Sequence, residues 1–299
     1  MKISFVNFWE KTPPWLVKFF KINICDDTSV VELNENPDIL FASCMGDINK
    51  VINSTAKIKI FYYGENLNVY KNRYDYSDFQ KLKEHFDLIV GFKYTDLTNK
   101  IVRFPLWFLY YPYYNYDERD NVLKYLQNSY NENSIKKINA ASLISRHGGY
   151  NNQRGQIYDE MIKYVKVYCP SDFKRNMKNI GPSSADKINF LKLTAYNICP
   201  ENSNYEGYHT EKIFEALEGG CIPIYSAIEI PEKDIINEKC YCFIDLNKEG
   251  DLEKKIKHVI ENYSEYFQTE IFKKDAGLVI KKYYDTFINE IKKLIKEKI

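Results

Sequence analysis

Short apolar runs alternate with amphipathic stretches along most of this chain. A short apolar run bounded by turn residues is typical of a buried strand, whereas apolar positions three and four residues apart predict a helix. Their alternation favours an α/β fold with largely parallel sheets. In chain order, the predicted elements are strands at 2–6, 39–42 and 57–62, a helix at 77–85, strands at 88–92 and 140–145, a helix at 152–164 and a strand at 165–168.

A polar stretch near the middle of the chain separates two halves of this kind. Residues 128–139 are rich in Asn, Ser and Lys and predict a linker. We therefore expect an N-terminal domain at 1–135, a C-terminal domain at 136–276 and a terminal helix at 277–299. In open α/β sheets, ligands bind beyond the carboxyl ends of the strands, so the cleft between the two domains is the expected binding region.

The terminal helix has one apolar face and one lysine-rich face. Its apolar positions are Tyr284, Phe287, Ile288, Ile291, Leu294 and Ile295. This face could pack back on the first domain, or the lysines could hold the chain on an anionic membrane surface. We favour packing, because Phe287 and Ile291 are large and the helix is short for an anchor.

Composition and charge exclude some classes of function. The chain has 299 residues, of which 44% are hydrophobic, enough for one large core or two medium ones. Its net charge of +1 gives no electrostatic reason to expect a nucleic-acid partner. The aromatic content of 16% suits a protein that stacks rings on sugars, although an AT-rich genome would raise the same residue types.

The cysteines and the first residues bear on the compartment. Seven cysteines are scattered along the chain, mostly in apolar runs, which indicates reduced thiols. The four histidines lie far apart in sequence, so a structural zinc site is not expected. The N-terminal residues enter directly into a strand pattern without a leader, and no apolar stretch of about 18 residues occurs. These features predict a cytoplasmic chain.

Residues 186–226 form the most informative segment, with the pattern of strand, polar loop, helix, glycine stop and buried strand. Thr210 is suited to cap the helix, and Gly219 and Gly220 are suited to end it. Lys212 then lies in the first turn, where a cation is unfavourable unless a phosphate lies between it and the free backbone amides. The alternative is an ordinary helix–strand unit with a solvated lysine.

The order of residues in this segment carries a resemblance. The matching stretches are Glu201-Asn202-Ser203, Tyr208-His209-Thr210-Glu211-Lys212-Ile213 and Ile222-Pro223-Ile224-Tyr225. They resemble the donor-binding signature of the α1,3/4-fucosyltransferases, glycosyltransferase family 10, in its soluble bacterial or viral type. The resemblance implies the GT-B architecture, in which two Rossmann-like α/β domains face each other across a cleft. It also implies that Lys212 contacts the donor phosphates and Glu211 the donor sugar hydroxyls, while Asn202 and Tyr208 line the pocket.

Two earlier segments match the same family in order. Residues 60–66 form a strand that ends in a glycine turn and resemble the family segment that holds the proposed general base. Glu65 would be this base, with Asn66 beside it, and an ordinary surface turn is the alternative. Residues 87–105 resemble the family's scaffold at the domain edge.

A further match concerns the donor pyrophosphate. The family places an arginine on it, ahead of a tyrosine, and Arg154 ahead of Tyr158 matches that pattern. Arg146, preceded by Ser145, is the rival cation. An arginine fork suits a pyrophosphate better than a lysine does, because it can donate two parallel hydrogen bonds.

Some motifs are missing from the sequence. It contains no Asp-X-Asp triplet, which would anchor a metal-bound diphosphate, and no G-x-G-x-x-G fingerprint or Walker loop. We therefore expect no metal site and no required cofactor. The charge on a GDP leaving group would be met by Arg154, Lys212 and helix N–H groups.

The resemblance implies an inverting fucosyltransferase that moves L-fucose from GDP-β-L-fucose to O3 of N-acetylglucosamine in N-acetyllactosamine-type glycans. Its partners would be GDP-β-L-fucose and an oligosaccharide acceptor. Three alternatives stay open: another GDP-sugar as donor, an unrelated acceptor, or a catalytically silent sugar-binding scaffold. The presence of Glu65, Arg154 and Lys212 argues against the silent scaffold. The sequence does not choose between 1,3, 1,4 and 1,2 linkages.

Overall fold

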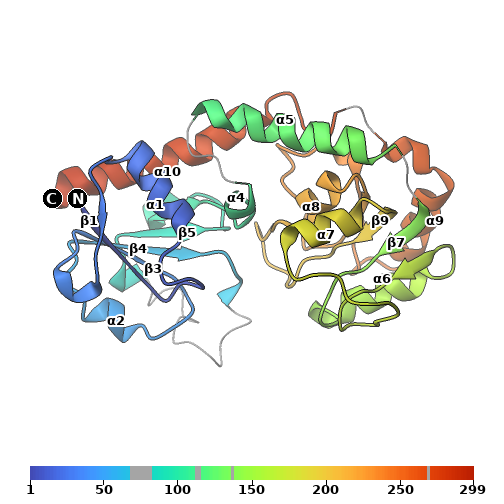
Figure 1. Cartoon of the computed structure of the whole chain (residues 1–299), viewed down its shortest axis with the longest axis horizontal. Helices are drawn as coiled ribbons and strands as arrows, with labels where there is room; N and C mark the ends of the chain where they lie inside the picture. The colour runs from blue at the N-terminus through green and yellow to red at the C-terminus, as the bar shows by residue number, and fades with distance from the viewer. Residues whose placement is uncertain (68–82, 112–115, 136–137, 268–269) are drawn as a thin grey trace. The chain divides into compact units, whose positions relative to one another are not determined.

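The chain folds into two compact units, each with its own parallel sheet (Figure 1). The first unit comprises residues 1–120 and 278–299, and the second comprises 121–277. Two α/β domains with parallel sheets were the fold class predicted from the sequence, and this prediction is confirmed. The helix predicted at 77–85 lies mostly outside the described residues. The computed structural model describes residues 1–67, 83–111, 116–135, 138–267 and 270–299, with the backbone alone at 116–121.

The sheet of the first unit has the strand order β2-β1-β3-β4-β5-β6. Every neighbouring pair in it is parallel, and the residues of β3 and β5 are all buried, as expected where helices cover both faces. The four strands predicted in this half are confirmed, whereas β2 and β6 are too short to give a recognisable apolar run. The strands are β1 (Lys2–Val6), β2 (Ser29–Val30), β3 (Ile39–Ala42), β4 (Ile58–Tyr63), β5 (Leu88–Gly91) and β6 (Ile101–Arg103).

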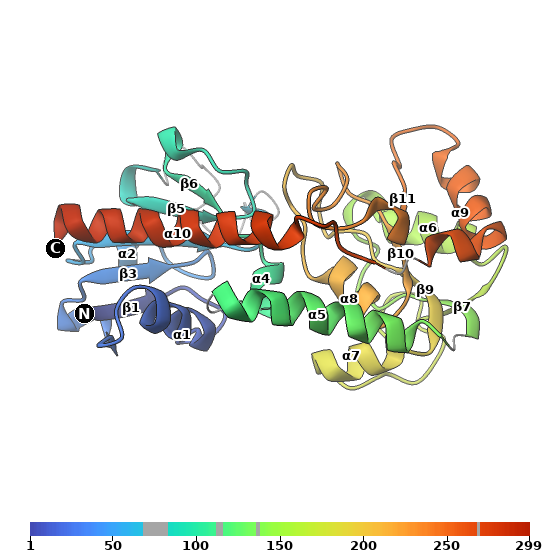
Figure 2. The same cartoon turned by 90° about the horizontal axis from the view of Figure 1, so that it is seen from above.

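The C-terminal helix α10 (Ala276–Lys298) packs within the first unit along most of its length, beside α1 (Figure 2). Phe287 stacks on Phe19 of α1 with ring centroids 5.2 Å apart and lies 5.0 Å from the ring of Phe104. The apolar face of α10 is thus used in packing, and membrane contact through its lysines stays an untested prediction. Among the residues that the structure describes, this unit also contains α1 (Pro14–Asn23), α2 (Asn49–Ile52) and α4 (Trp107–Tyr110), with 3₁₀ turns at Leu33–Glu35 and Leu97–Asn99.

Replacing Phe287 by alanine is expected to destabilise the first unit. Phe287 is 1% exposed between two aromatic rings, and the loss of a buried phenylalanine costs about 3–5 kcal/mol because a cavity remains. Thermal and urea unfolding would measure the change. The matched control is Leu278→Ala on the same helix, which should change stability by less than about 0.5 kcal/mol because this side chain is 60% exposed. Equal effects of the two variants would contradict the packing.

The sheet of the second unit has the strand order β11-β10-β9-β7-β8, and its neighbouring pairs are again parallel. Strands predicted at 140–145, at 165–168 and after the glycine pair are confirmed, the first with shifted bounds and the other two with shorter ones. The strands are β7 (Ile138–Ser142), β8 (Lys166–Tyr168), β9 (Thr194–Ile198), β10 (Ile222–Tyr225) and β11 (Cys242–Phe243). The helices are α5 (Tyr116–Asn133), α6 (Gln153–Met161), α7 (Ser184–Leu191), α8 (Lys212–Glu218) and α9 (Asp251–Glu261), with 3₁₀ turns at Tyr150–Asn152, Glu238–Cys240 and Tyr263–Tyr266.

Two predictions in this half are wrong. The linker expected at 128–139 is helical as far as Asn133, because Leu126 and Tyr130, one turn apart, are both buried and give α5 an apolar face. The strand expected to start at residue 186 starts only at Thr194, because residues 184–191 form helix α7. Ser183 caps this helix, since its side chain accepts a hydrogen bond from the Asp186 amide. No helix among the described residues is both long enough and apolar enough to span a bilayer.

Candidate functional site

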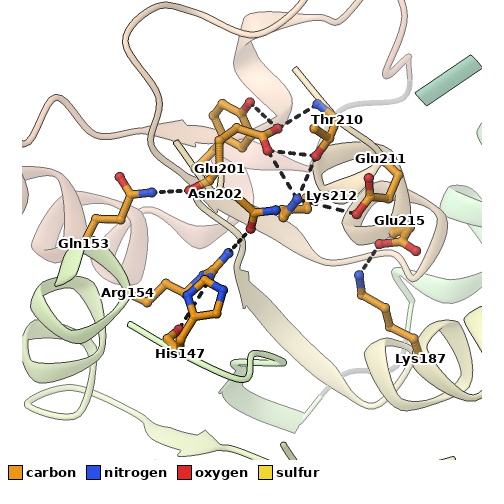
Figure 3. A network of polar contacts seen from close by, with 11 residues as sticks. His147, Gln153, Arg154, Lys187, Glu201, Asn202, Thr210, Glu211, Lys212 and Glu215 are labelled. Atoms are coloured by element: carbon orange, nitrogen blue, oxygen red, sulfur yellow. Dashed lines mark hydrogen bonds and ion pairs between the residues drawn. The ribbon is translucent and has the colours of Figure 1, made fainter. Parts of the chain in front are cut away.

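Charged and polar side chains gather beside the carboxyl edge of the second sheet (Figure 3). They come from the loop after β7, the start of α6, the loop after β9 and the start of α8. Because β7 and β9 are parallel neighbours, their following loops leave the sheet at the same edge. The structure thus brings together Arg154, Asn202, Glu211 and Lys212, which the sequence analysis assigned to one site.

Arg154 lies in the first turn of α6 and is 5% exposed. Its Nη2 atom donates to Oδ1 of Asn202 at 2.7 Å, and its Nη1 atom donates to the backbone carbonyl of His147 at 3.2 Å. Burial lowers the pKa of the guanidinium, while the nearby Glu201 carboxylate acts in the opposite direction. A guanidinium keeps its charge in proteins, so the site holds a fixed, oriented cation.

His147 contacts the Arg154 guanidinium through both its backbone carbonyl and its ring. Burial lowers the pKa of its imidazole, and the neighbouring cations Arg154 and Lys212 lower it further. Its Nδ1 atom accepts the backbone N–H of Gly149 at 3.1 Å and lies 3.2 Å from Nη1 of Arg154. At neutral pH the ring is therefore an uncharged acceptor that steadies the guanidinium.

Lys212 is the second cation of the site. Its Nζ atom donates to Oγ1 of Thr210 at 2.8 Å and lies 3.3 Å from Oε2 of Glu201 and 3.5 Å from Oε1 of Glu211. The lysine side chain is 14% exposed, whereas Glu201 is fully buried. Glu201 belongs to the motif that resembles the family's donor-binding signature, but the sequence alone indicates no role for it.

The start of α8 differs from the prediction. The helix begins at Lys212 with Glu211 as its N-cap residue, and no side chain caps it. Thr210 does not cap the helix, because its hydroxyl donates to Oε2 of Glu201 instead, at 2.8 Å. With only seven residues, α8 contributes little dipole, so the fixed charges of the side chains dominate this site.

Glu211 keeps its negative charge in this position. Burial works to raise the pKa of its carboxyl group, but the neighbouring Lys212 and Lys187 outweigh it and hold the pKa below its usual value. Lys187 also pairs with Glu215 on α8. The cluster therefore alternates cations and carboxylates, as a site for a charged, hydroxylated ligand would.

Three other predicted residues lie around this cluster. Ser145 is buried, and its hydroxyl donates to the backbone carbonyl of His147 at 2.7 Å, so it shapes the loop after β7. Arg146 is exposed and makes no hydrogen bond or ion pair with any described residue. Tyr208 is 1% exposed, and it acts on the pKa of the Arg154 guanidinium in the same direction as Glu201, so its role in the pocket stays a prediction. Of the two rival arginines, Arg154 is the one that the structure joins to the cluster.

Glu65 and Asn66 lie in the first unit, directly after β4. Glu65 is half-buried, and Asn66 is buried. Glycine fits closely at position 64, because a Cβ atom there would lie 2.6 Å from Cδ1 of Leu106 and the leucine side chain would have to shift. The close packing of Leu106 against this turn fixes the path of the chain that presents Glu65.

The negative charge of Glu65 acts on buried groups at the same edge of the sheet. Burial, with a smaller contribution from Glu65, raises the pKa of the Cys44 thiol to about 11. Burial also raises the pKa of Tyr62, again with a contribution from Glu65. Neither group carries a charge at neutral pH, and the role of Glu65 as general base stays a prediction.

The described residues contain no group of three or more His, Cys, Asp or Glu side chains arranged to hold a metal ion. The acidic residues Asp75 and Asp78, which would be the next place to look for a metal, lie outside the described part of the chain. Whether activity depends on a metal therefore stays a prediction.

Two protein-family models match this chain, one in each half. Residues 3–110 match the model of the alpha-(1,3)-fucosyltransferase FucT N-terminal domain, and residues 133–286 match the C-terminal model of glycosyltransferase family 10 (fucosyltransferase). The chain belongs to glycosyltransferase family 10. The boundary between the two matches falls within or beside α5, where the structure also passes from its first unit to its second.

Individual members of the family are distant relatives. The alpha-(1,3)-fucosyltransferase FucT of Helicobacter pylori is 24% identical over 253 residues, which cover 75% of this chain and 50% of the relative. A putative fucosyltransferase-like protein of Arabidopsis thaliana is 27% identical over 133 residues, covering 44% of this chain and 25% of the relative. The chain thus spans about half the length or less of these curated relatives.

Solved structures share the fold. A crystal structure of an α1,3-fucosyltransferase with GDP-fucose aligns with a TM-score of 0.64 at 20% identity, covering 96% of this chain and 90% of the other. A second α1,3-fucosyltransferase structure gives a TM-score of 0.65 at 19% identity, with 97% and 90% covered. The predicted GT-B fold class is confirmed by these similarities.

Proposed function

We propose that this chain is an inverting fucosyltransferase that uses GDP-β-L-fucose as its donor. The observation that carries the proposal is the pair of cations in the second unit, Arg154 and Lys212, each held by a residue of the loop after β9. A diphosphate leaving group develops negative charge as the glycosidic bond breaks, and preorganised cations stabilise that charge. Both cations lie in the part of the chain that matches the family's C-terminal model.

Recognition of the fucosyl group is assigned to the acidic side of the same cluster. Glu211 carries an ionised carboxylate beside Lys212 and can accept hydrogen bonds from sugar hydroxyls. Asn202 holds Arg154 through its Oδ1 atom. Its amide nitrogen is a second polar group for the donor.

Glu65 of the first unit is the proposed general base. It takes the proton from the acceptor hydroxyl, whose oxygen attacks the anomeric carbon on the face opposite to GDP. The bond from carbon to the diphosphate breaks as the new bond forms, so the β-linked donor gives an α-linked product. By family, the proposed acceptor hydroxyl is O3 of N-acetylglucosamine in N-acetyllactosamine-type glycans.

A transfer assay with product analysis tests this function. GDP release from GDP-fucose should depend on added N-acetyllactosamine, and linkage analysis of the product should give α1,3-linked fucose. GDP-mannose serves as the control donor and should give no transfer. Release without acceptor dependence, or transfer from GDP-mannose alone, would point to a different sugar transferase. GDP binding without turnover on any acceptor would point to a silent scaffold.

Activity is expected to survive removal of divalent cations. The proposed site meets the leaving-group charge with Arg154 and Lys212, and the sequence has no Asp-X-Asp triplet that would anchor a metal-bound diphosphate. The transfer rate after treatment with EDTA should therefore stay above about a tenth of the untreated rate, where a tenfold loss corresponds to ~1.4 kcal/mol of barrier. A larger loss that Mn²⁺ restores would contradict this prediction.

A further inference from the structure

Glu201 lies at the centre of the proposed donor site, but no part of it is accessible to solvent. Its carboxylate is fully buried and accepts hydrogen bonds on both oxygens (Figure 3). Oε1 accepts the backbone N–H of Thr210 and the phenol of Tyr225, each at 2.8 Å. Oε2 accepts the hydroxyl of Thr210 at 2.8 Å and the Lys212 ammonium at 3.3 Å. The four donors come from two polypeptide segments that Glu201 ties together.

The Thr210 hydroxyl links the Glu201 carboxylate to the Lys212 ammonium group. It has a single proton, which it gives to Oε2 of Glu201, so its lone pairs face Nζ of Lys212 at 2.8 Å. The ammonium group is thus fixed from two directions, by the carboxylate and by a hydroxyl that the carboxylate orients. The residue next to Glu201, Asn202, fixes Arg154 in the same way. One short loop therefore sets both cations.

We infer that Glu201 is a positioning residue for the donor diphosphate and that it acts through Lys212. This inference rests on the proposed function, because it takes the Lys212 ammonium as a phosphate contact. Glu201 is buried and cannot itself touch the ligand. From charge balance alone, removing this carboxylate would strengthen the binding of an anionic ligand. We expect weaker binding instead, because the loss of order at Lys212 outweighs the gain in positive potential.

The variant that isolates this role is Glu201→Gln. Its amide keeps the shape and one acceptor oxygen, and that oxygen must face the Thr210 amide, because a backbone N–H cannot turn away. The amide NH₂ group then faces Lys212, where a donor meets a donor, and the Thr210 hydroxyl can only accept from it by turning its own proton away. The fold keeps its buried contacts while Lys212 loses its charged partner.

Titration of GDP into four proteins tests the inference: the parent, Glu201→Gln, Lys212→Ala and the double variant. Glu201→Gln should weaken GDP binding about tenfold, as loss of a charge-assisted hydrogen bond does. The double variant should bind no more weakly than Lys212→Ala alone, because a residue that acts only through Lys212 has nothing further to lose. The matched control is Glu160→Gln, which should keep the parent affinity. Glu160 is a buried residue of α6, and its Oε2 atom lies 2.5 Å from Nζ of Lys163.

Thr210→Val is the second variant, in case Glu201→Gln does not fold. It keeps the carboxylate and removes the hydroxyl that links it to Lys212, so it should weaken GDP binding several-fold. Unchanged or tighter binding in Glu201→Gln, unchanged binding in a folded Thr210→Val, or losses that add up in the double variant would each overturn the inference. If the parent itself does not bind GDP, the donor assignment of the proposed function fails instead.

Discussion

Changing Glu65 to glutamine is expected to lower fucosyl transfer by ~10²–10⁴-fold, the range found when a general base is lost. Glutamine is nearly the same shape as glutamate but cannot take the acceptor proton. A general base acts only as the transition state forms, so the loss should appear in the rate of transfer and not in donor affinity. GDP should bind within a few-fold of the parent.

The position of Glu65 motivates this prediction. Glu65 follows β4 at the carboxyl edge of the first sheet, on a turn that Gly64 and Leu106 fix in place. It belongs to the first unit, whereas Arg154 and Lys212 belong to the second. Its removal should therefore leave the phosphate-binding cations untouched.

Single-turnover transfer, measured beside GDP titration, separates this role from that of a turn residue. The matched control is Glu84→Gln, an exposed carboxylate of the same unit, which should keep the parent rate. If Glu65→Gln retains more than a tenth of the parent rate, another carboxylate must be the base. Glu211 would then be the next candidate, since it is the acidic group already beside Lys212 at 3.5 Å.

The strands were predictable because their signal is local. An apolar run such as Ile39–Ala42 is buried along its whole length, so the run itself marks the strand. Helix α5 was not predictable in the same way, because most of its residues are polar and the buried positions Leu126 and Tyr130 stand alone among them. In such segments the choice between loop and helix depends on a partner surface that the local sequence does not contain.

The candidate site was predictable as a set of residues but not as a network. Arg154, Asn202 and Lys212 were found through a motif, and the structure brings them together. The central role of Glu201 depends on partners that are distant along the chain: Thr210, nine residues away, and Tyr225, 24 residues away. Glu201 could be recognised as a buried carboxylate surrounded by several hydrogen-bond donors. Its burial, however, is known only once the strands are assembled into a sheet.

The second large effect is expected at the two cations. Either Arg154→Ala or Lys212→Ala should weaken GDP binding by about 1.5–3 kcal/mol, the scale of hydrogen bonds to charged groups, which corresponds to roughly 10- to 150-fold in affinity. Calorimetric titration with GDP measures it. Arg154→Lys should fall between the parent and alanine, because it keeps the charge but loses the planar fork that can bind two phosphate oxygens at once.

Arg146 supplies the control for this experiment within the same loop region. It has the same side chain as Arg154 but is exposed and unpaired among the described residues, whereas Arg154 is buried and held by Asn202 and His147. Long-range attraction of GDP would be reduced equally by removing either arginine and would disappear at high salt. Direct contact predicts instead that Arg146→Ala binds GDP like the parent while Arg154→Ala does not, and that the difference persists in high salt. The reverse result would move the phosphate contact to Arg146 and leave Arg154 as a structural residue of α6.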